Sequence, residues 1–437
     1  MPDRMLPLIA RYHPGRVFAW RGGEPLLCGR ALTEVQALAR RMAPNKPYIN
    51  LCEDRYRFTL AFAAVALAGG FSLLPQSRAA GALVDVQSDY TGALTVDDDQ
   101  VTAWLTAAQS TDAPAQCPSL TATRLMAVVF TSGSTGRPAR HRKYWGDLAL
   151  GTALYQRRFF ATGDPPHALA TVPPQHMYGL ETSVLPALRL GFAADAGRPF
   201  MPWTVAEALA RLPAPRLLIT TPVHLQACFD AGVAMPELAQ VISATAPLEA
   251  GLAQAIERAW QTRVHEIYGS TETGSIASRR TATTDIWTLY DGMSLAQRDA
   301  VWVSGPQLQD PFRLSDDLEV LDEHRFRLLG RAGDMLKTAG KRLSINELTR
   351  HLLEIEGVED AVVFRPSNDA AAPRPAALVV APALGVREIA ARLALVVDPV
   401  FVPRPLLRVG VLPRNALGKL PRDELLALLQ QARGPGT

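Results

Sequence analysis

The sequence predicts an α/β protein with a large N-terminal domain of stacked α/β sheets, a small β-subdomain, and a small C-terminal α+β domain. Short apolar runs alternate with helical segments through the first part of the chain, as in parallel βαβ units. Many of these runs end in turns rich in Gly, Ser, Thr and Pro. Beyond about Trp287 the pattern changes to short alternating strands. The length of 437 residues is sufficient for two or three domains.

The first third of the chain sets up the alternation of helix and strand. Thr33 is a potential cap for a helix that runs to about Met42. The elements that follow are a strand at 47–52, a helix at 54–68, a strand at 71–74, a weak helix at 101–108, and an apolar strand that starts at Leu125. This order indicates parallel strands joined by helices.

The middle of the chain continues the same pattern. Helices are expected at 146–159, 184–190, 204–212 and 249–261, and strands at 168–172, 216–220, 241–244 and 264–267. Ligands of open α/β sheets bind beyond the carboxyl ends of the strands. The turns after these strands are therefore where a site is expected.

The last third predicts a smaller unit of mixed composition. Strands are expected at 300–304, 318–321, 326–329, 361–364 and 377–381, with an acidic helix at 345–354. Gly330 and Gly333 supply backbone freedom between the two parts. We place the domains at 1–331 and 332–437.

Composition excludes several classes of protein. The chain is 48% hydrophobic and 20% charged, with a net charge of only +3, so a nucleic-acid partner is not indicated. The longest apolar run, at 60–74, is broken by Gly69 and Gly70 and is shorter than the ~20 residues that a spanning helix needs. Membrane insertion is therefore not expected, and no feature indicates an oligomeric state.

The cysteines and the N-terminus indicate a cytoplasmic protein. Four scattered cysteines form no CxxC pair, so neither a zinc site nor a disulfide framework is suggested. The first residues contain charges and prolines but no apolar core of a secretory signal.

Residues 130–138, FTSGSTGRP, form the most informative segment. Glycines and hydroxyl residues directly after an apolar strand are suited to surrounding phosphate oxygens. The pattern GxxxxGK[ST] does not match, because Gly133 and Gly136 are too close together and Arg137 follows. A flexible Ser/Gly linker or a plain strand-to-turn connection is the alternative for this loop taken alone.

Four segments together give the chain its resemblance to a family. FTSGSTGRP at 130–138, IYGSTETG at 267–274, LGRAGDMLKTAGKRL at 329–343 and PRNALGKLPR at 413–422 stand in the order found in the adenylate-forming (ANL) superfamily. This superfamily includes AMP-dependent acyl- and aryl-CoA synthetases and acyl-carrier-protein ligases. The resemblance extends from about residue 48 to residue 425. This chain resembles a compact form, because the part before the domain boundary is shorter than usual.

The resemblance implies an ATP-dependent acid–thiol ligase. A carboxylic acid is activated as acyl-AMP with release of pyrophosphate, and the acyl group then passes to the thiol of CoA or of a phosphopantetheinyl acyl carrier protein. ATP and Mg²⁺ are the implied cofactors. Attack of a carboxylate on the α-phosphate brings anions together, so cations and N–H donors are needed around the phosphates.

The resemblance also assigns the nucleotide-binding residues. The pyrophosphate loop comprises Thr131, Ser132, Gly133, Ser134, Thr135 and Gly136. Thr271 contacts the α-phosphate, and Glu272 ligates Mg²⁺, although an acid in a polar turn can also be merely a surface residue. In the resemblance, adenine lies between Tyr268 and the turn SATAP at 243–247. Ala246, Gly269 and Ser270 are the other residues assigned to nucleotide binding.

The remaining assignments concern the ribose and the C-terminal domain. Asp316 binds the ribose hydroxyls together with Arg331, and its neighbour Asp317 is the rival candidate. Lys419 bridges the substrate carboxylate and the α-phosphate during adenylation, although a lysine this near the C-terminus is ordinarily only solvated. The resemblance implies a mobile C-terminal domain that then brings forward the loop at 337–342. Gly340 approaches the pantetheine arm of the incoming thiol.

The acid pocket is assigned to two segments. His176, Tyr178 and Gly179 belong to PPQHMYGLE, and Ser243 and Ala244 to SATAP. His176 is grouped with the catalytic residues as a gate, although a satisfied buried histidine is the alternative. Family members that activate amino acids carry an aspartate in the first segment, and none stands between 173 and 180. We therefore expect an aromatic acid without an α-amine, similar to hydroxybenzoate, with a medium-chain fatty acid as the alternative.

The phosphate loop departs from the family in one respect. The family has a lysine after the loop proline, whereas Pro138 is followed by Ala139. The nearby basic residues are Arg137, Arg140, Arg142 and Lys143, and one or two of them are expected to supply the missing charge. An impaired relative that only binds nucleotide or carrier protein is the competing function.

Overall fold

The computed structural model describes residues 4–75, 78, 80–107, 116–131, 139–331, 335–338, 341–366, 375–414 and 420–433. The chain forms two compact units. The large unit comprises Met1–Leu295 and Val303–Phe312, and the small unit comprises Ala296–Trp302 and Arg313–Thr437. Strands β17 (Ser294–Gln297), β18 (Val301–Ser304) and β19 (Phe312–Arg313) contain the points where the chain passes from one unit to the other. The domain boundary between 331 and 332 stays a prediction.

The first sheet of the large unit is a parallel sheet with one antiparallel edge. Its strands, in spatial order, are β6 (Leu94–Val96), β4 (Pro47–Asn50), β5 (Phe71–Leu74), β8 (Leu125–Thr131) and β9 (Ala139–Tyr144). The pairs among β4, β5, β6 and β8 are parallel, whereas β9 returns antiparallel to β8. The expected βαβ units are thus present. Strand β9 was not predicted from the sequence, because its residues ARHRKY carry charges in place of an apolar run.

The second sheet of the large unit contains the parallel strands at whose carboxyl ends a site was expected. Its strands, in spatial order, are β16 (Ile286–Leu289), β15 (Gly274–Arg279), β14 (Val264–Ser270), β13 (Gln240–Ser243), β12 (Arg216–Thr220), β10 (His167–Ala170), β11 (Ala193–Asp195), β2 (Val17–Arg21) and β3 (Glu24–Leu27). Strands β10, β12, β13 and β14 are parallel to one another. A separate pair joins β1 (Met5–Pro7) to β7 (Ser119–Thr121).

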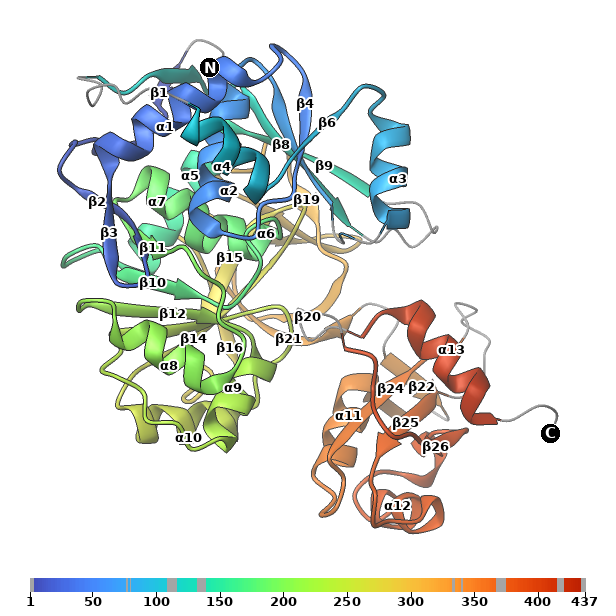
Figure 1. The fold of residues 1–437 in the computed structure, drawn as a ribbon. Helices are drawn as coiled ribbons and strands as arrows, with labels where there is room; N and C mark the ends of the chain where they lie inside the picture. Colours follow the sequence, from blue (N-terminus) through green and yellow to red (C-terminus); the bar gives the residue numbers. More distant parts are fainter. Residues whose placement is uncertain are drawn as a thin grey trace. The chain divides into compact units, whose positions relative to one another are not determined.

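Helices cover and separate the two sheets. They are α1 (Cys28–Arg41), α2 (Arg55–Leu67), α3 (Ala80–Asp89), α4 (Asp98–Thr106), α5 (Trp145–Phe159), α6 (Met177–Gly179), the π-helix η1 (Leu180–Val184), α7 (Leu185–Arg189), α8 (Pro202–Ala210), α9 (Pro222–Asp230) and α10 (Ala250–Trp260). Helix α2 is buried over almost its whole length and contacts β4, β5 and β8 of the first sheet and β11 of the second. The sheets are therefore stacked around it. Figure 1 shows α8, α9 and α10 gathered beside β12 and β14.

Two helices show how well local signals predicted the boundaries. The Asp54 carboxylate accepts a hydrogen bond from Arg57 N and caps α2, where the sequence placed a helix start. The expected start of α1 at Thr33 was wrong. Helix α1 begins at Cys28 without a side-chain cap, and the Thr33 hydroxyl donates to Gly29 O inside the helix.

The small unit is an α+β fold with its own apolar cores. Its elements are the hairpin β20 (Asp316–Val320) and β21 (Arg325–Arg331), the hairpin β22 (Met335–Thr338) and β23 (Lys341–Ser344), then α11 (Ile345–Leu353), β24 (Asp360–Phe364), β25 (Ala376–Val380), α12 (Val386–Leu393), the 3₁₀ helix η2 (Pro399–Phe401), β26 (Leu406–Arg408) and α13 (Arg422–Arg433). Leu348, Val379 and Ile389 are fully buried in one core. The predicted fold class, a large sheet-rich α/β domain and a small C-terminal domain, is confirmed. Within the described ranges, no helix is long and apolar enough to cross a bilayer.

Candidate active site

The acid-pocket segment is tied to the carboxyl ends of two parallel strands. Tyr178, in α6, donates its hydroxyl to Thr220 O at 3.1 Å and to Ile242 O at 2.8 Å. Thr220 is in register with Ser243 across β12 and β13. Three of the predicted pocket residues, Tyr178, Gly179 and Ser243, are therefore brought to one edge of the second sheet, with Ala244 directly after β13.

Gly179 is required by a close approach of α6 to the preceding chain. A Cβ at this position would lie 2.9 Å from the carbonyl carbon of Pro173 and closer still to its oxygen. Since these are backbone atoms, no side-chain rotation can relieve the contact. His176 lies at the N-cap of α6, and its carbonyl accepts from Leu180 N, so it belongs to the same rigid segment.

The hydroxyl of Ser243 is buried at the carboxyl end of β13. Ser243 is fully buried, and its Oγ has no hydrogen-bond partner in the described part of the chain. A buried hydroxyl without a partner costs about 1–3 kcal/mol. Gln175, which the sequence analysis did not single out, likewise has a buried and unpartnered Oε1 among the described residues.

The turn SATAP after β13 is strained and firmly held. Thr245 has φ of +84°, a left-handed conformation that β-branched residues rarely adopt and that is found mostly at functional sites. Just after the turn, Leu248 N donates to the Glu266 carboxylate at 3.0 Å. Glu266 also pairs with Arg279 at 2.7 Å. Sequence reasoning missed Glu266, which sits two residues before Tyr268 and fixes the exit of the turn that contains Ala246.

Tyr268, on β14, lies beside a cluster of aromatic and basic groups. Its ring centroid is 5.6 Å from that of Trp287, and the Arg279 guanidinium lies 4.6 Å from the centroid of the Trp287 ring. The position at the end of a parallel strand next to SATAP suits the stacking role expected of Tyr268.

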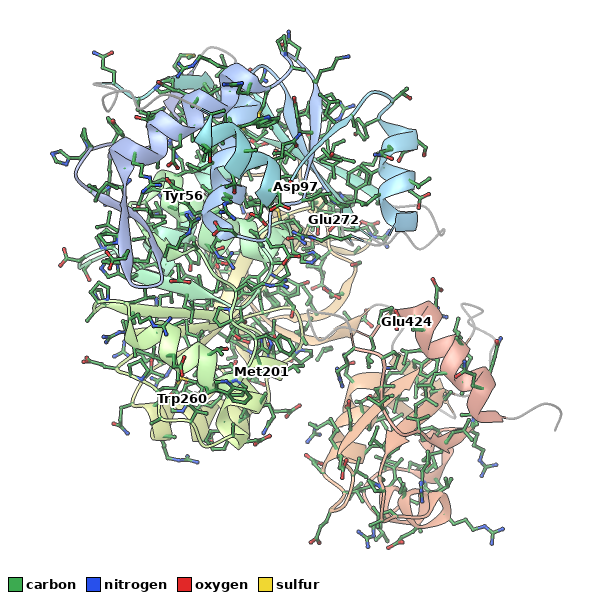
Figure 2. All side chains as sticks on the ribbon, viewed as in Figure 1. Tyr56, Asp97, Met201, Trp260, Glu272 and Glu424 are labelled. Carbon is green, nitrogen blue, oxygen red and sulfur yellow. The ribbon has the colours of Figure 1, made fainter. Side chains whose placement is uncertain are left out.

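The segment from Gly269 to Gly274 forms a closed turn between β14 and β15. Ser270 and Thr273 exchange hydrogen bonds, with Ser270 N donating to Thr273 Oγ1 and Thr273 N donating to Ser270 Oγ, both at 3.3 Å. Strand β14 therefore extends through Ser270 and does not end at Ile267 as expected. The turn presents Thr271 and Glu272; Glu272 is labelled in Figure 2, and about a third of its side chain is exposed.

A histidine on β9 connects two of the predicted site residues. His141 Nε2 is 3.0 Å from Thr131 Oγ1 and 3.4 Å from Glu272 Oε1. Burial lowers the pKa of His141, with the Glu272 carboxylate opposing that shift. The phosphate-loop strand and the predicted metal ligand are thus brought together through a residue that belongs to no motif.

The basic residues after the loop face different partners. Arg140 Nη2 pairs with Asp89 at 2.9 Å, whereas Lys143 Nζ donates to the main-chain oxygen of Glu272 at 3.1 Å. Lys143 is 8% exposed and lines a cavity of about 350 Å³ together with Glu181 and Glu272. Burial lowers the pKa of Lys143, and the nearby carboxylates oppose this.

The residues present fit a Mg²⁺ ion that arrives with a nucleotide. Glu272 offers an exposed carboxylate, and the hydroxyl of Thr131 lies near the same nitrogen of His141. No group of three His, Cys, Asp or Glu side chains in the described ranges is arranged to hold a metal ion by itself. Mg²⁺ is commonly held by one or two carboxylates with phosphate oxygens and water, which this donor set allows.

The ribose candidates belong to the small unit. Asp316 and Arg331 are register partners across the β20–β21 hairpin, whereas Asp317 faces Gly330. Asp316 was preferred to Asp317 because of its spacing from Arg331 in the sequence. The register of the hairpin agrees with that preference. Residues 132–136 of the loop, Gly340 and Lys419 lie outside the described residues, so their assignments stay predictions.

The fold of this chain is shared with a solved coenzyme A synthetase. The structure of o-succinylbenzoate coenzyme A synthetase from Bacillus subtilis, in complex with ATP and magnesium ion, matches with a TM-score of 0.81 at 16% sequence identity and covers 97% of this chain and 100% of that one. At that identity the likeness shows the fold alone.

The sequence comparisons specify the family. The profile of the AMP-binding enzyme family matches residues 49–304. A 4-coumarate–CoA ligase of Halorhodospira halophila is 30% identical over 66% of this chain and 73% of that protein. Another from Rhodobacter capsulatus is 32% identical over 56% and 61%. A 3,4-dihydroxybenzoate–[aryl-carrier protein] ligase of Bacillus anthracis is 22% identical over 68% and 72%. The chain belongs to the AMP-binding enzyme family of AMP-forming acid–thiol ligases.

Proposed function

We propose that the chain activates an aromatic carboxylic acid without an α-amine and transfers it to the thiol of CoA or of an acyl carrier protein. A carboxylate oxygen attacks the α-phosphorus of ATP, and the bond to the pyrophosphate oxygen breaks. The thiolate sulfur then attacks the acyl carbon, and AMP leaves. Both steps develop charge on oxygen that fixed hydrogen-bond donors and cations must stabilise.

The pocket edge at β12 and β13 carries this proposal. Tyr178 fixes the pocket segment on the strand ends. We propose that Ser243, whose buried hydroxyl has no partner among the described residues, contacts a polar group of the substrate. A ring hydroxyl would satisfy the hydroxyl of Ser243, whereas a plain alkyl chain would not. The segment from 173 to 180 contains no aspartate to pair with an amine. Relatives named for coumarate and dihydroxybenzoate support the same class of acid.

Individual residues are proposed to hold the phosphates, the metal ion, the ribose and the substrate carboxylate. Thr131 and Thr271 are proposed to contact phosphate oxygens, and Glu272 to hold Mg²⁺, which would neutralise charge on the departing pyrophosphate. Asp316 is proposed to hold the ribose. Lys419 is proposed to bring the substrate carboxylate to the α-phosphate.

We also propose that the chain acts in the cytoplasm and that its thiol acceptor is CoA or a carrier protein. All four cysteines are free thiols, which supports the reducing environment of the cytoplasm. A relative named as an aryl-carrier-protein ligase supports a carrier protein as one possible acceptor besides CoA.

Acid-dependent exchange of labelled pyrophosphate into ATP tests the substrate class. The panel contains hydroxybenzoates, benzoate, 4-coumarate, malonate, a medium-chain fatty acid and amino acids. Hydroxylated aromatic acids are expected to give the fastest exchange. Fastest exchange with the fatty acid or malonate would overturn the aromatic assignment, and exchange with no acid would favour the binding-module alternative. Mass spectrometry of thioester products then distinguishes CoA from a phosphopantetheinylated carrier protein.

A further inference from the structure

Two alternate residues of β9 reach the same residue of the neighbouring turn. His141 and Lys143 are two positions apart on a strand, so their side chains lie on one face. Lys143 Nζ donates to the Glu272 carbonyl oxygen at 3.1 Å, and His141 Nε2 lies 3.4 Å from the Glu272 carboxylate. Glu272 is therefore contacted at its backbone and at its side chain by one strand.

The surroundings of Lys143 are acidic. Its cavity is also lined by Arg142 and by the carboxylates of Asp147, Glu181 and Glu272. A buried ammonium is stable only when it is paired and hydrogen-bonded, and here the protein itself supplies the counter-charges. A phosphate placed against Lys143 would meet these carboxylates, so Lys143 is poorly suited to contact phosphate directly.

Glu181 completes the support of the turn from the other side. Its carboxylate accepts from Ser275 N at 3.0 Å and from Ser275 Oγ at 2.7 Å, directly after the turn that presents Glu272. It lies in the π-helix η1, which follows the pocket segment and is a type of element often found at functional sites. Lys143 and Glu181 thus line the same cavity, and they hold the two ends of the segment from Glu272 to Ser275.

We propose that His141 and Lys143 are positioning residues that fix Glu272 as the Mg²⁺ ligand, His141 through its carboxylate and Lys143 through its main-chain carbonyl. This inference rests on the proposed function. Lys143 then acts on bound nucleotide through the metal and not through a phosphate contact. Strand β9 thus provides part of the support for nucleotide binding that the family obtains from a lysine after the loop proline. That lysine is missing after Pro138.

Calorimetric titration of the full chain with ATP, with Mg²⁺ or with EDTA, tests the inference without catalysis. For Lys143→Met, affinity for Mg·ATP is expected to fall about tenfold or more, as for loss of one charge-assisted hydrogen bond. Affinity for metal-free ATP is expected to change less than about twofold. His141→Ala is expected to raise the Mg²⁺ concentration needed for half-maximal ATP binding. Arg30→Met, on the exposed face of α1, is the matched control.

The outcomes separate the possible roles. Equal losses with Mg²⁺ and with EDTA would assign Lys143 to phosphate and overturn the inference, as would no loss at all. If Lys143→Met does not fold, the double variant with Glu181→Gln removes both buried charges and is titrated in the same way. An affinity of the wild-type chain for ATP that is the same with Mg²⁺ and with EDTA would also overturn the inference. Failure of the proposed function would appear separately, as absence of acid-dependent pyrophosphate exchange by the wild-type chain.

Discussion

Gly179→Ala is expected to disable the acid pocket while leaving the nucleotide side intact. The new methyl group would lie 2.9 Å from the Pro173 carbonyl carbon, whereas carbon atoms in contact are ~3.5–4.0 Å apart. Helix α6 or the chain at Pro173 must therefore shift by roughly 1 Å. Because Tyr178 and His176 belong to this segment, the pocket shifts with them. A displacement of about 1 Å at a reacting group costs on the order of 100-fold in rate.

Pyrophosphate exchange at varied acid and varied ATP measures this effect. We expect kcat/KM for the acid to fall about 100-fold, with KM for ATP little changed. Gly251→Ala is the control, since a Cβ at Gly251 in α10 meets nothing within 4 Å. Unchanged acid kinetics in Gly179→Ala would refute the placement of the pocket at α6. An equal rise in KM for ATP would show that the shift is not confined to the pocket.

Three further predictions concern other parts of the chain. Glu266→Gln removes the buried counter-charge of Arg279 and is expected to cost about 3 kcal/mol in urea unfolding; a loss below about 1 kcal/mol would contradict the ion pair's role. Lys419→Ala is expected to abolish pyrophosphate exchange but to spare thioester formation from supplied acyl-AMP, and equal loss of both would exclude separate conformations for the two steps. Burial raises the pKa of the Cys228 thiol to about 11. At pH 8 its thiolate is therefore roughly 200-fold scarcer than in a free cysteine. Iodoacetamide should label Cys228 only after denaturation, and rapid labelling of the native chain would contradict its burial.

Local signals predicted the elements of the parallel sheets, and tertiary contacts decided the rest. Helix α2 was predictable because Asp54 caps it within the sequence itself. Helix α3 and strand β9 were missed because neither carries an apolar periodicity; β9 exists through its pairing with β8. Helix α9, capped by Thr221, was not predicted, because it begins directly after a strand, where a turn was expected.

Motifs identified part of the candidate site, and the structure added the residues that support it. Thr131 and Glu272 stand in segments whose resemblance to the family assigned them. His141 and Lys143 carry no motif, although their i, i+2 spacing directly after the loop was an available signal. Glu181 is the one charged residue in the segment 177–188, which is the usual sign of a buried charge with a partner.

Comparison of wild-type chain with Glu272→Gln in acid-dependent pyrophosphate exchange tests the central claim most directly. The wild-type chain is expected to exchange pyrophosphate into ATP only when an acid is added. Glu272→Gln is expected to lose about 100-fold of that rate at limiting Mg²⁺, because the site loses its charged metal ligand. Undiminished exchange by Glu272→Gln, or exchange by neither protein with any acid, would contradict an adenylation site at this turn.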